Sequence, residues 1–299
     1  MHIADSFQNW EKVLYFFSEL KYNPTIKTNT PPRGRKDCMK MKKMIAMVLA
    51  LVMMAACFAG CGSKKDSDLA YVKDKGKLIV GITDYAPMDY KDENGNWTGF
   101  DAEFARLVAK ELGVEVEFFV LSDWEQKFYE LETKNVDAVW NGMTITEEAK
   151  LNASVSDPYV INAQVVVMKA DAVGSYTTPE SLKGLKFAVE NGSAGALALD
   201  DIGITDYVAV QDQTSAVMEV AAGTSDACVI DITMAYAMTG PGTSYADLGV
   251  GLSLTSEEYG IAFRKDSDIT AKVNEIMKKL IADGTLPALA EKYGLTLAG

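Results

Sequence analysis

From Lys77 onward, short apolar runs alternate with stretches in which apolar residues recur every three or four positions. The runs at 77–82, 114–121 and 136–140 predict strands. Apolar residues at one helical face between 100 and 112, ending at Gly113, predict a helix, and residues 123–134 predict another. Strands that alternate with helices of this length indicate α/β sheets of the parallel type.

The second half of the chain continues this alternation. Further strands are expected at 163–168, 185–190, 207–210, 227–230 and 259–263, and further helices after Thr178-Pro179 and at 194–201, 214–222, 232–239, 269–282 and 286–293. Two segments of the chain are similar to each other. Asp137-Ala138 begins a strand that ends at the polar Asn141, and Asp226-Ala227 begins a strand that ends at the polar Asp231. Ligands of doubly wound sheets bind beyond such strand ends, so this internal similarity predicts two lobes that face one cleft.

The N-terminal region reads as a secretion signal. Lys40, Lys42 and Lys43 precede an uncharged apolar segment, 44–60, which is too short to span a membrane comfortably. Small residues before Cys61 and a polar stretch after it resemble a bacterial lipoprotein cleavage motif, with Cys57 as a weaker candidate and plain secretion as the alternative. We therefore expect a lipid anchor at Cys61 and a position on the outer face of the cytoplasmic membrane, periplasmic or extracellular.

Residues 1–38 lie upstream of this signal, where no segment is expected. Translation is predicted to begin at Met39 or Met41, which makes 1–38 an artefactual leader and 39–60 the signal peptide. Residues 61–75 are predicted to be a flexible tether.

The net charge and the residue composition exclude several classes of function. The 299 residues contain 29 Lys and Arg against 42 Asp and Glu, a net charge of −13 that argues against nucleic-acid binding. The one histidine, His2, lies in the leader, and Cys228 reads as a buried strand residue without a disulfide partner. Cys/His zinc sites and histidine-based triads are thereby removed, so an enzyme would have to work with carboxylates. We expect no metal and no cofactor.

Several short motifs occur along the chain, and their order and spacing together are characteristic of one protein family. They lie at 80–87, 95–101, 137–138, 142–146, 156–159, 192–193, 223–227, 259–261 and 283–284. With Trp124 and Asp231, they resemble the family 3 solute-binding proteins of polar amino-acid ABC importers over about residues 76–294.

The resemblance implies a two-lobed periplasmic-binding-protein fold of type II. The chain would cross between lobes near 159–164 and 257–261, so that lobe 1 takes 76–161 plus 260–299 and lobe 2 takes 162–259. A ligand binds between open lobes, the hinge closes, and the closed monomer is presented to an ABC permease and its ATPase subunits.

The same resemblance suggests the ligand-binding residues: Asp84, Tyr85, Trp124, Asn141, Gly142, Thr144, Glu190, Asn191, Ser193 and Asp231. Trp124 would stack on the ligand, or else pack in the core. Thr144 would hydrogen-bond the ligand, or cap a helix together with Glu147. Asp231 would accept the ligand's ammonium, or cap the helix that starts at Ile232.

One departure matters for the ligand. The family usually has an arginine for the ligand's carboxylate where this chain has Ala149, and Lys150 would point about 100° further round a helix. Asp84, Glu190 and Asp231 gather beside aromatics without an arginine, and an unpaired buried carboxylate is costly. We therefore expect a ligand with an ammonium group, its carboxylate held by backbone N–H groups, and not glutamate.

Other functions remain open at this point. Aromatic side chains beside acids also suit a quaternary ammonium ligand, so the chain could be an amine-binding or amine-sensing protein of the same fold. A cyclohexadienyl-dehydratase-like enzyme is a further alternative, with Glu190 as its only candidate acid.

Overall fold

The computed structural model of the chain describes residues 67–299. The expected leader, the signal peptide and Cys61 lie outside the described residues, so what is expected of them stays a prediction. Within 67–299 we find no helix with the length and apolar character that a membrane span requires.

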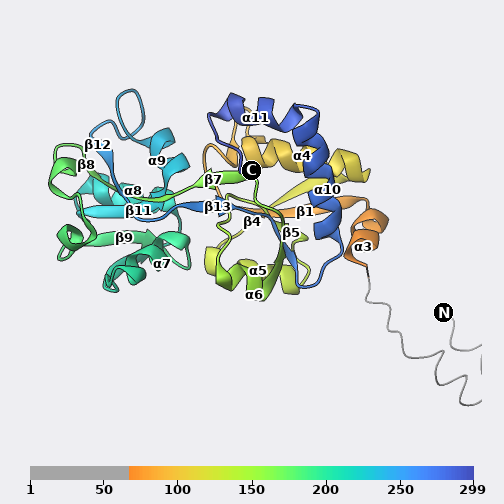
Figure 1. Ribbon diagram of the computed structural model, residues 1–299, viewed down its shortest axis with the longest axis horizontal. Coiled ribbons are helices and arrows are strands. Elements are labelled where there is room, and N and C mark those ends of the chain that lie inside the picture. Colours follow the sequence, from red (N-terminus) through yellow and green to blue (C-terminus); the bar gives the residue numbers. More distant parts are fainter. Residues whose placement is uncertain (1–66) are drawn as a thin grey trace, which may run out of the picture. The chain divides into compact units, whose positions relative to one another are not determined.

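The first sheet forms lobe 1, and its strands lie in the order β4-β1-β5-β14-β6 (Figure 1). These strands are β1 (Lys77–Ile82), β4 (Glu115–Val120), β5 (Ala138–Val139), β6 (Ala153–Val155) and β14 (Ala262–Arg264). Helices α4 (Phe100–Leu112), α10 (Ile269–Ala282) and α11 (Thr285–Tyr293) pack together on one face, and α5 (Lys127–Glu132) and α6 (Glu147–Asn152) lie on the other. A hairpin of β2 (Tyr90–Lys91) and β3 (Trp97–Thr98) precedes α4.

The second sheet forms lobe 2, in the order β10-β9-β11-β8-β12. Its elements are β8 (Gln164–Lys169), β9 (Phe187–Glu190), α7 (Ala194–Asp201), β10 (Tyr207–Val210), α8 (Gln213–Ala222), β11 (Ala227–Asp231), α9 (Ile232–Met238) and β12 (Leu248–Ser253), with single 3-10 turns η2 (Val173–Ser175) and η3 (Pro179–Leu182). The strands have apolar residues on both faces: Val165 and Val167 pack with α8 and α9, whereas Val166 and Met168 pack with α7.

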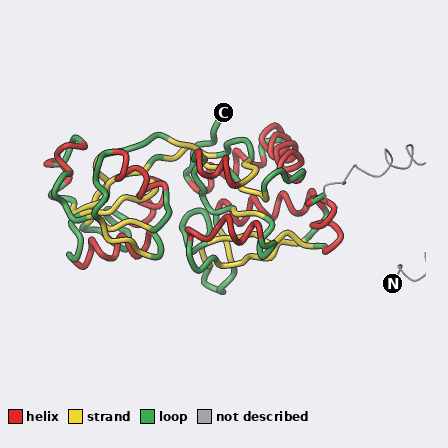
Figure 2. Tube along the Cα trace, turned by 90° about the horizontal axis from the view of Figure 1, so that it is seen from below, coloured by secondary structure: helices red, strands yellow, loops and turns green. Residues whose placement is uncertain are grey.

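Two extended segments join the lobes. Strands β7 (Val160–Asn162) and β13 (Glu257–Tyr259) form an antiparallel pair between the two sheets (Figures 1 and 2). A strand that arrives directly from the other lobe starts at the cleft edge of its sheet, while a strand reached through a crossover helix ends there. Accordingly β8 and β14 run antiparallel to β11 and β5, and the sheets are mixed rather than purely parallel.

The structure corrects several expected elements. Of the strand predicted at 136–140 only Ala138–Val139 pairs as β5, and the strand predicted at 259–263 is divided between β13 and β14. The helix predicted from Asp123 begins as a 3-10 turn, η1 (Trp124–Gln126), because Asp123 caps Glu125 N–H.

The flexible tether predicted for 61–75 is wrong over its second half. Asp68–Lys75 form helix α3, whose Val72 is fully buried. The Arg264 guanidinium lies 3.0 Å from an Asp68 carboxylate oxygen and fixes this helix to β14. The prediction for Cys228 is confirmed, since its side chain is buried and free. Trp140 is a core residue whose ring meets Phe104 edge-on at 4.7 Å.

Candidate functional site

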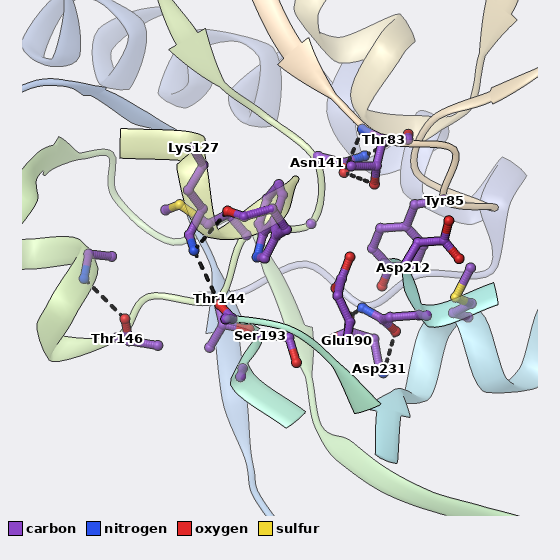
Figure 3. A pocket seen from close by; sticks show the side chains of 18 of the residues that line it. Thr83, Tyr85, Lys127, Asn141, Thr144, Thr146, Glu190, Ser193, Asp212 and Asp231 are labelled. Carbon is purple, nitrogen blue, oxygen red and sulfur yellow. Dashed lines mark hydrogen bonds between the residues drawn. The ribbon is translucent and has the colours of Figure 1, made fainter. Parts of the chain in front are cut away.

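A pocket lies where the carboxyl ends of β1 and β5 in lobe 1 face those of β9 and β11 in lobe 2 (Figure 3). Lobe 1 lines it with Thr83, Asp84, Tyr85, Trp124, Lys127, Asn141, Gly142, Met143, Thr144, Thr146, Glu148 and Ala149. Lobe 2 lines it with Glu190, Gly192, Ser193, Ala194, Leu197, Asp212, Gln213, Asp231 and Met234. Both strand ends singled out by the internal similarity therefore meet in one place, as the doubly wound topology requires.

Nine of the ten residues expected to bind the ligand line this pocket, and Asn191 does not. Asn191 is exposed, and its side-chain amide donates to the Glu125 carboxylate at 2.8 Å. Because Glu125 belongs to lobe 1 and Asn191 to lobe 2, this hydrogen bond joins the lobes at the rim of the pocket.

The Asn141 side chain is directed into lobe 1. Its oxygen accepts from the Thr83 N–H at 2.9 Å and from the Thr83 hydroxyl at 2.5 Å, and its amide donates to Asp89 at 2.8 Å. These bonds tie the ends of β1 and β5 together and leave little of the amide for a ligand. Asn141 thus shapes the wall of the pocket.

The turn after β5 is held from behind by a buried acid. The Asp101 carboxylate accepts from Gly142 N–H at 2.6 Å and from the Tyr159 hydroxyl at 2.8 Å. Burial raises the pKa of Asp101 to about 7, against these hydrogen bonds. Gly142 has φ +57°, and a Cβ there would lie 2.5 Å from a Tyr85 ring carbon, so a larger residue does not fit.

Thr144 does not cap the following helix, which corrects the Thr144–Glu147 capping box. The Thr144 hydroxyl donates to Glu257 at 2.8 Å, next to the strands that join the lobes. Thr146 is the N-cap of α6 instead, accepting from Ala149 N–H at 3.0 Å.

Two aromatic side chains form the apolar part of the lobe 1 wall. Trp124 and Tyr85 are both buried, with 8% and 4% of their surface exposed. The Tyr85 hydroxyl lies 2.6 Å from the Thr233 hydroxyl of lobe 2 and 2.5 Å from the Tyr259 hydroxyl of β13. Tyr85 is therefore both a pocket residue and a contact between the lobes.

The end of β11 places Asp231 in the pocket, 3% exposed. Side-chain amides of Asn162, Gln164 and Gln213 donate to its carboxylate, and it makes no capping bond to α9. Burial and the Glu257 charge raise the pKa of Asp231 to about 6. Hydrogen bonds from Gln213, Tyr259 and Asn162 oppose this rise, so most of the acceptor positions of the carboxylate are used within the protein.

The neighbouring strand end carries a second buried acid. Glu190 ends β9 with 5% of its surface exposed. Burial, followed by the negative charges of Asp231 and Asp212, raises the pKa of Glu190 to about 8. Such a carboxyl group is stabilised as an anion by any positive charge that enters the pocket.

The last two expected residues lie at the margins of the acid group. Ser193 is the N-cap of α7, accepting from Ala196 N–H at 3.2 Å. Asp84, at the end of β1, is exposed; partial burial raises its pKa, the Lys91 charge opposes this rise and the Asp212 charge adds to it.

Sequence reasoning missed Lys127, Asp212 and Gln213. Lys127 is 6% exposed, and burial lowers its pKa. It follows Trp124 by three residues, a spacing that places both on one helix face, and this signal could have found it. Lys150, considered instead as the cation of the site, is an exposed partner of Glu147 and does not line the pocket.

Within residues 67–299, no group of three or more His, Cys, Asp or Glu side chains has an arrangement that could hold a metal ion. The polar side chains of the pocket are acids, hydroxyls, the amides of Asn141 and Gln213, and the Lys127 ammonium. They are suited to hydrogen bonds and ion pairs with a small organic ligand.

Comparisons with known proteins agree on one family. The family model for bacterial extracellular solute-binding proteins, family 3, matches residues 78–296. The chain is 31% identical to the L-cystine-binding protein TcyJ of Escherichia coli (strain K12), over 85% of this chain and 97% of that protein. It is 33% identical to the arginine-binding extracellular protein ArtP of Bacillus subtilis (strain 168), over 85% of this chain and 98% of that protein.

A solved structure gives the same fold. The crystal structure of the ancestral amino acid-binding protein AncCDT-1, a precursor of cyclohexadienyl dehydratase, superposes with a TM-score of 0.69 at 34% identity. It covers 76% of this chain and 99% of that one.

Proposed function

Because the chain belongs to the bacterial extracellular solute-binding proteins of family 3, we propose that it captures an amino acid or related amine with a positively charged group and delivers it to an ABC importer. The lobes close over the ligand by hinge bending at β7 and β13, and the closed form meets the permease and its ATPase subunits. For this proposal we keep the lobe boundaries predicted from the sequence, 76–161 plus 260–299 for lobe 1 and 162–259 for lobe 2.

The observation that carries this proposal is the group of acids in lobe 2. Glu190 and Asp231 are buried at the pocket, and Asp212 lies beside them. The pKa of Glu190 is raised to about 8 and the pKa of Asp231 to about 6. Buried carboxylates without a cation are costly. A ligand ammonium or guanidinium relieves that cost, so closure is favoured with a cationic ligand and disfavoured with an anionic one.

One relative supports this ligand class. The relative named for arginine binds an amino acid with a cationic side chain, whereas the relative named for cystine binds one whose two ammonium groups are matched by two carboxylates. Trp124 and Tyr85 supply the aromatic faces on which a guanidinium or an ammonium is attracted. We place basic amino acids first, and an amine or quaternary ammonium ligand second.

Contacts between the lobes support closure as the working motion. Beyond the Tyr85–Thr233 and Asn191–Glu125 pairs, the Gln211 amide of lobe 2 donates to the Ser122 carbonyl of lobe 1 at 3.2 Å. A ligand that touches both lobes adds to these bonds only when the lobes are closed, which is the differential affinity that closure requires.

We also propose that the protein acts as a monomer held by a lipid on Cys61 at the outer face of the membrane. The support is the small-residue and cysteine pattern that follows an apolar signal segment. Intact-mass spectrometry of the protein purified from bacterial membranes tests it: a diacylglyceryl cysteine at position 61 is expected, and an unmodified secreted chain contradicts it.

Catalysis is not proposed, although one structural neighbour is a precursor of a dehydratase. Glu190 is a buried acid with a raised pKa, as a general acid would be. The three acids at this end of the pocket, however, disfavour a substrate that has carboxylates and no ammonium group. Incubation with prephenate-like compounds is expected to give no product.

Isothermal titration calorimetry with a panel of ligands tests the proposed function. The panel contains L-arginine, L-lysine, L-histidine, L-cystine, L-glutamine, L-glutamate and choline. We expect tight binding of at least one member with an extra positive charge and no binding of L-glutamate. Tight L-glutamate binding, or binding of no member at all, contradicts the proposal.

A further inference from the structure

Lys127 is a buried cation without a counter-ion. It opens α5, only 6% of it is exposed, and among residues 67–299 it makes no ion pair. An ammonium removed from water in this way is destabilised unless a negative group approaches it. Sequence reasoning considered only an arginine and Lys150 as cations of the pocket, and it did not identify Lys127.

The hydrogen bonds of Lys127 leave one proton unused. Its ammonium donates to the Trp124 carbonyl at 3.3 Å and to the Gly192 carbonyl of lobe 2 at 3.2 Å, both at the long end of the hydrogen-bond range. An ammonium has three protons to donate. The rings of Trp124 and Phe128 lie 5.1 Å and 4.9 Å from the nitrogen and add an apolar side to its surroundings.

Lys127 lies across the pocket from Asp212 and Asp231, while the charges of Glu148 and Glu190, which also line the pocket, oppose the lowering of the Lys127 pKa by burial. Figure 3 shows the Lys127 side chain on one side of the pocket, Asp212 and Asp231 on the other, and Glu190 between them. A zwitterionic amino acid has a negative end and at least one positive end. Such a molecule fits this polarity only with its positive group toward Asp212 and Asp231 and its carboxylate toward Lys127.

The geometry points to Lys127 as the residue that binds the ligand's carboxylate, so that the pocket selects amino acids over the corresponding amines. This inference rests on the proposed function and adds the identity of the anion-binding group. Ala149 lines the same pocket with a methyl group only, which leaves the approach to the ammonium unobstructed by a second charged chain at that position.

A purely structural role for Lys127 makes a different prediction. If the side chain serves only to join the lobes through the Gly192 carbonyl, its loss lowers the affinity for every ligand by the same factor, because closure is impaired whichever ligand is bound. A carboxylate-binding role weakens only ligands that have a carboxylate. Pairs of ligands that differ in this group alone separate the two roles.

The test is calorimetry with three such pairs: L-arginine and agmatine, L-lysine and cadaverine, L-histidine and histamine. For the wild-type protein we expect the amino acid to bind between about 10- and 100-fold more tightly than its amine, as a charge-assisted hydrogen bond provides. In Lys127→Met this preference should fall to within about threefold, while Lys127→Arg should keep it. Lys150→Met is the matched control, since that lysine is exposed and outside the pocket, and should behave as wild type.

The outcomes are distinguishable. Equal weakening of both members of a pair by Lys127→Met overturns the inference and leaves the proposed function intact. A wild-type protein that binds an amine as tightly as its amino acid also overturns the inference, whether or not the variants fold. A wild-type protein that binds none of the three amino acids overturns the inference. If it also binds no other member of the calorimetry panel, the proposed function is overturned as well.

Discussion

The two walls of the pocket differ in kind. The lobe 1 wall consists of the aromatic rings of Tyr85 and Trp124, neutral amide and hydroxyl groups, and the Lys127 ammonium, with Asp84 and Glu148 at its edge. The lobe 2 wall is dominated by acids, Glu190, Asp212 and Asp231. The polarity of the pocket is thus divided between two bodies that a hinge can separate.

The hydrogen bonds at the two strand ends show the same difference. Asn141 at the end of β5 is satisfied by its own lobe, so this wall is shaped before any ligand arrives. Glu190 at the end of β9 has its pKa raised by burial and by neighbouring negative charge, so this wall holds unfavourable electrostatic energy. Lobe 1 therefore provides shape, and lobe 2 provides the charge that makes a cationic ligand favourable.

The largest effect is expected from neutralising the lobe 2 wall with Glu190→Gln. Loss of one partner of a buried charged pair reduces binding of L-arginine by about 2–3 kcal/mol, roughly 30- to 150-fold. The unliganded variant should be more stable than wild type at pH 8.5, because a buried, ionised carboxylate has been removed. Calorimetry and thermal unfolding at pH 8.5 measure the two effects, which have opposite signs.

Asp84→Asn is the matched control on the lobe 1 side. Asp84 also lines the pocket but is exposed, and exposed ion pairs contribute about 0–1 kcal/mol. Its affinity loss should stay below about fivefold. Equal losses in Asp84→Asn and Glu190→Gln would show that the two walls do not differ as described.

The pH dependence of stability and of ligand affinity further tests the difference between the two walls. Glu190 has a pKa of about 8 in the folded protein and an ordinary value near 4.5 when unfolded, so the folded state holds the proton longer. Stability of the unliganded protein should therefore fall as pH rises from about 4.5 to 8. A cationic ligand favours the ionised form, so its affinity should rise by up to about tenfold per pH unit below pH 8, with release of a proton.

Calorimetry at pH 6, 7 and 8 in buffers of different ionisation enthalpy measures the proton release. In Glu190→Gln the release should diminish, and what is left belongs to Asp231, whose pKa is about 6. Proton uptake on binding would contradict the assignment of the charge to this wall.

Much of the fold follows from the apolar pattern. The strand at 77–82 and the helices at 194–201 and 269–282 have the bounds that the sequence predicts, because each has a continuous period and a clear end. Elements at the joint between lobes were not predictable in this way. The strand expected at 259–263 splits at Gly260-Ile261, and what divides it is the change from one sheet to another, which leaves no mark in the hydrophobic period.

The site was predictable where strand ends carry polar residues and not where helices approach it. Asn141 and Asp231 follow their strands directly, so topology alone brings them together. Lys127 and Asp212 reach the pocket from the starts of helices, α5 and α8, whose orientation depends on packing. Asp212 looks like an ordinary helix cap, and it is one: it accepts from Ser215 N–H at 2.7 Å.

A close contact between the backbones of the two lobes gives the smallest predicted effect. Gly192 of lobe 2 has φ +66°, and a Cβ there would lie 3.1 Å from Glu125 Cα of lobe 1. Gly192→Ala should weaken L-arginine binding about fivefold, because an overpacked contact of roughly 1 kcal/mol opposes closure. Gly203→Ala is the matched control, with φ +79° and nothing within 4 Å of its Cβ. Both variants should lose about 1 kcal/mol of stability from backbone strain, and only Gly192→Ala should lose affinity.

Small-angle scattering with saturating ligand should show that Gly192→Ala is more open than Gly203→Ala. Equal affinity losses in the two variants would mean that strain within lobe 2, and not contact between the walls, governs binding.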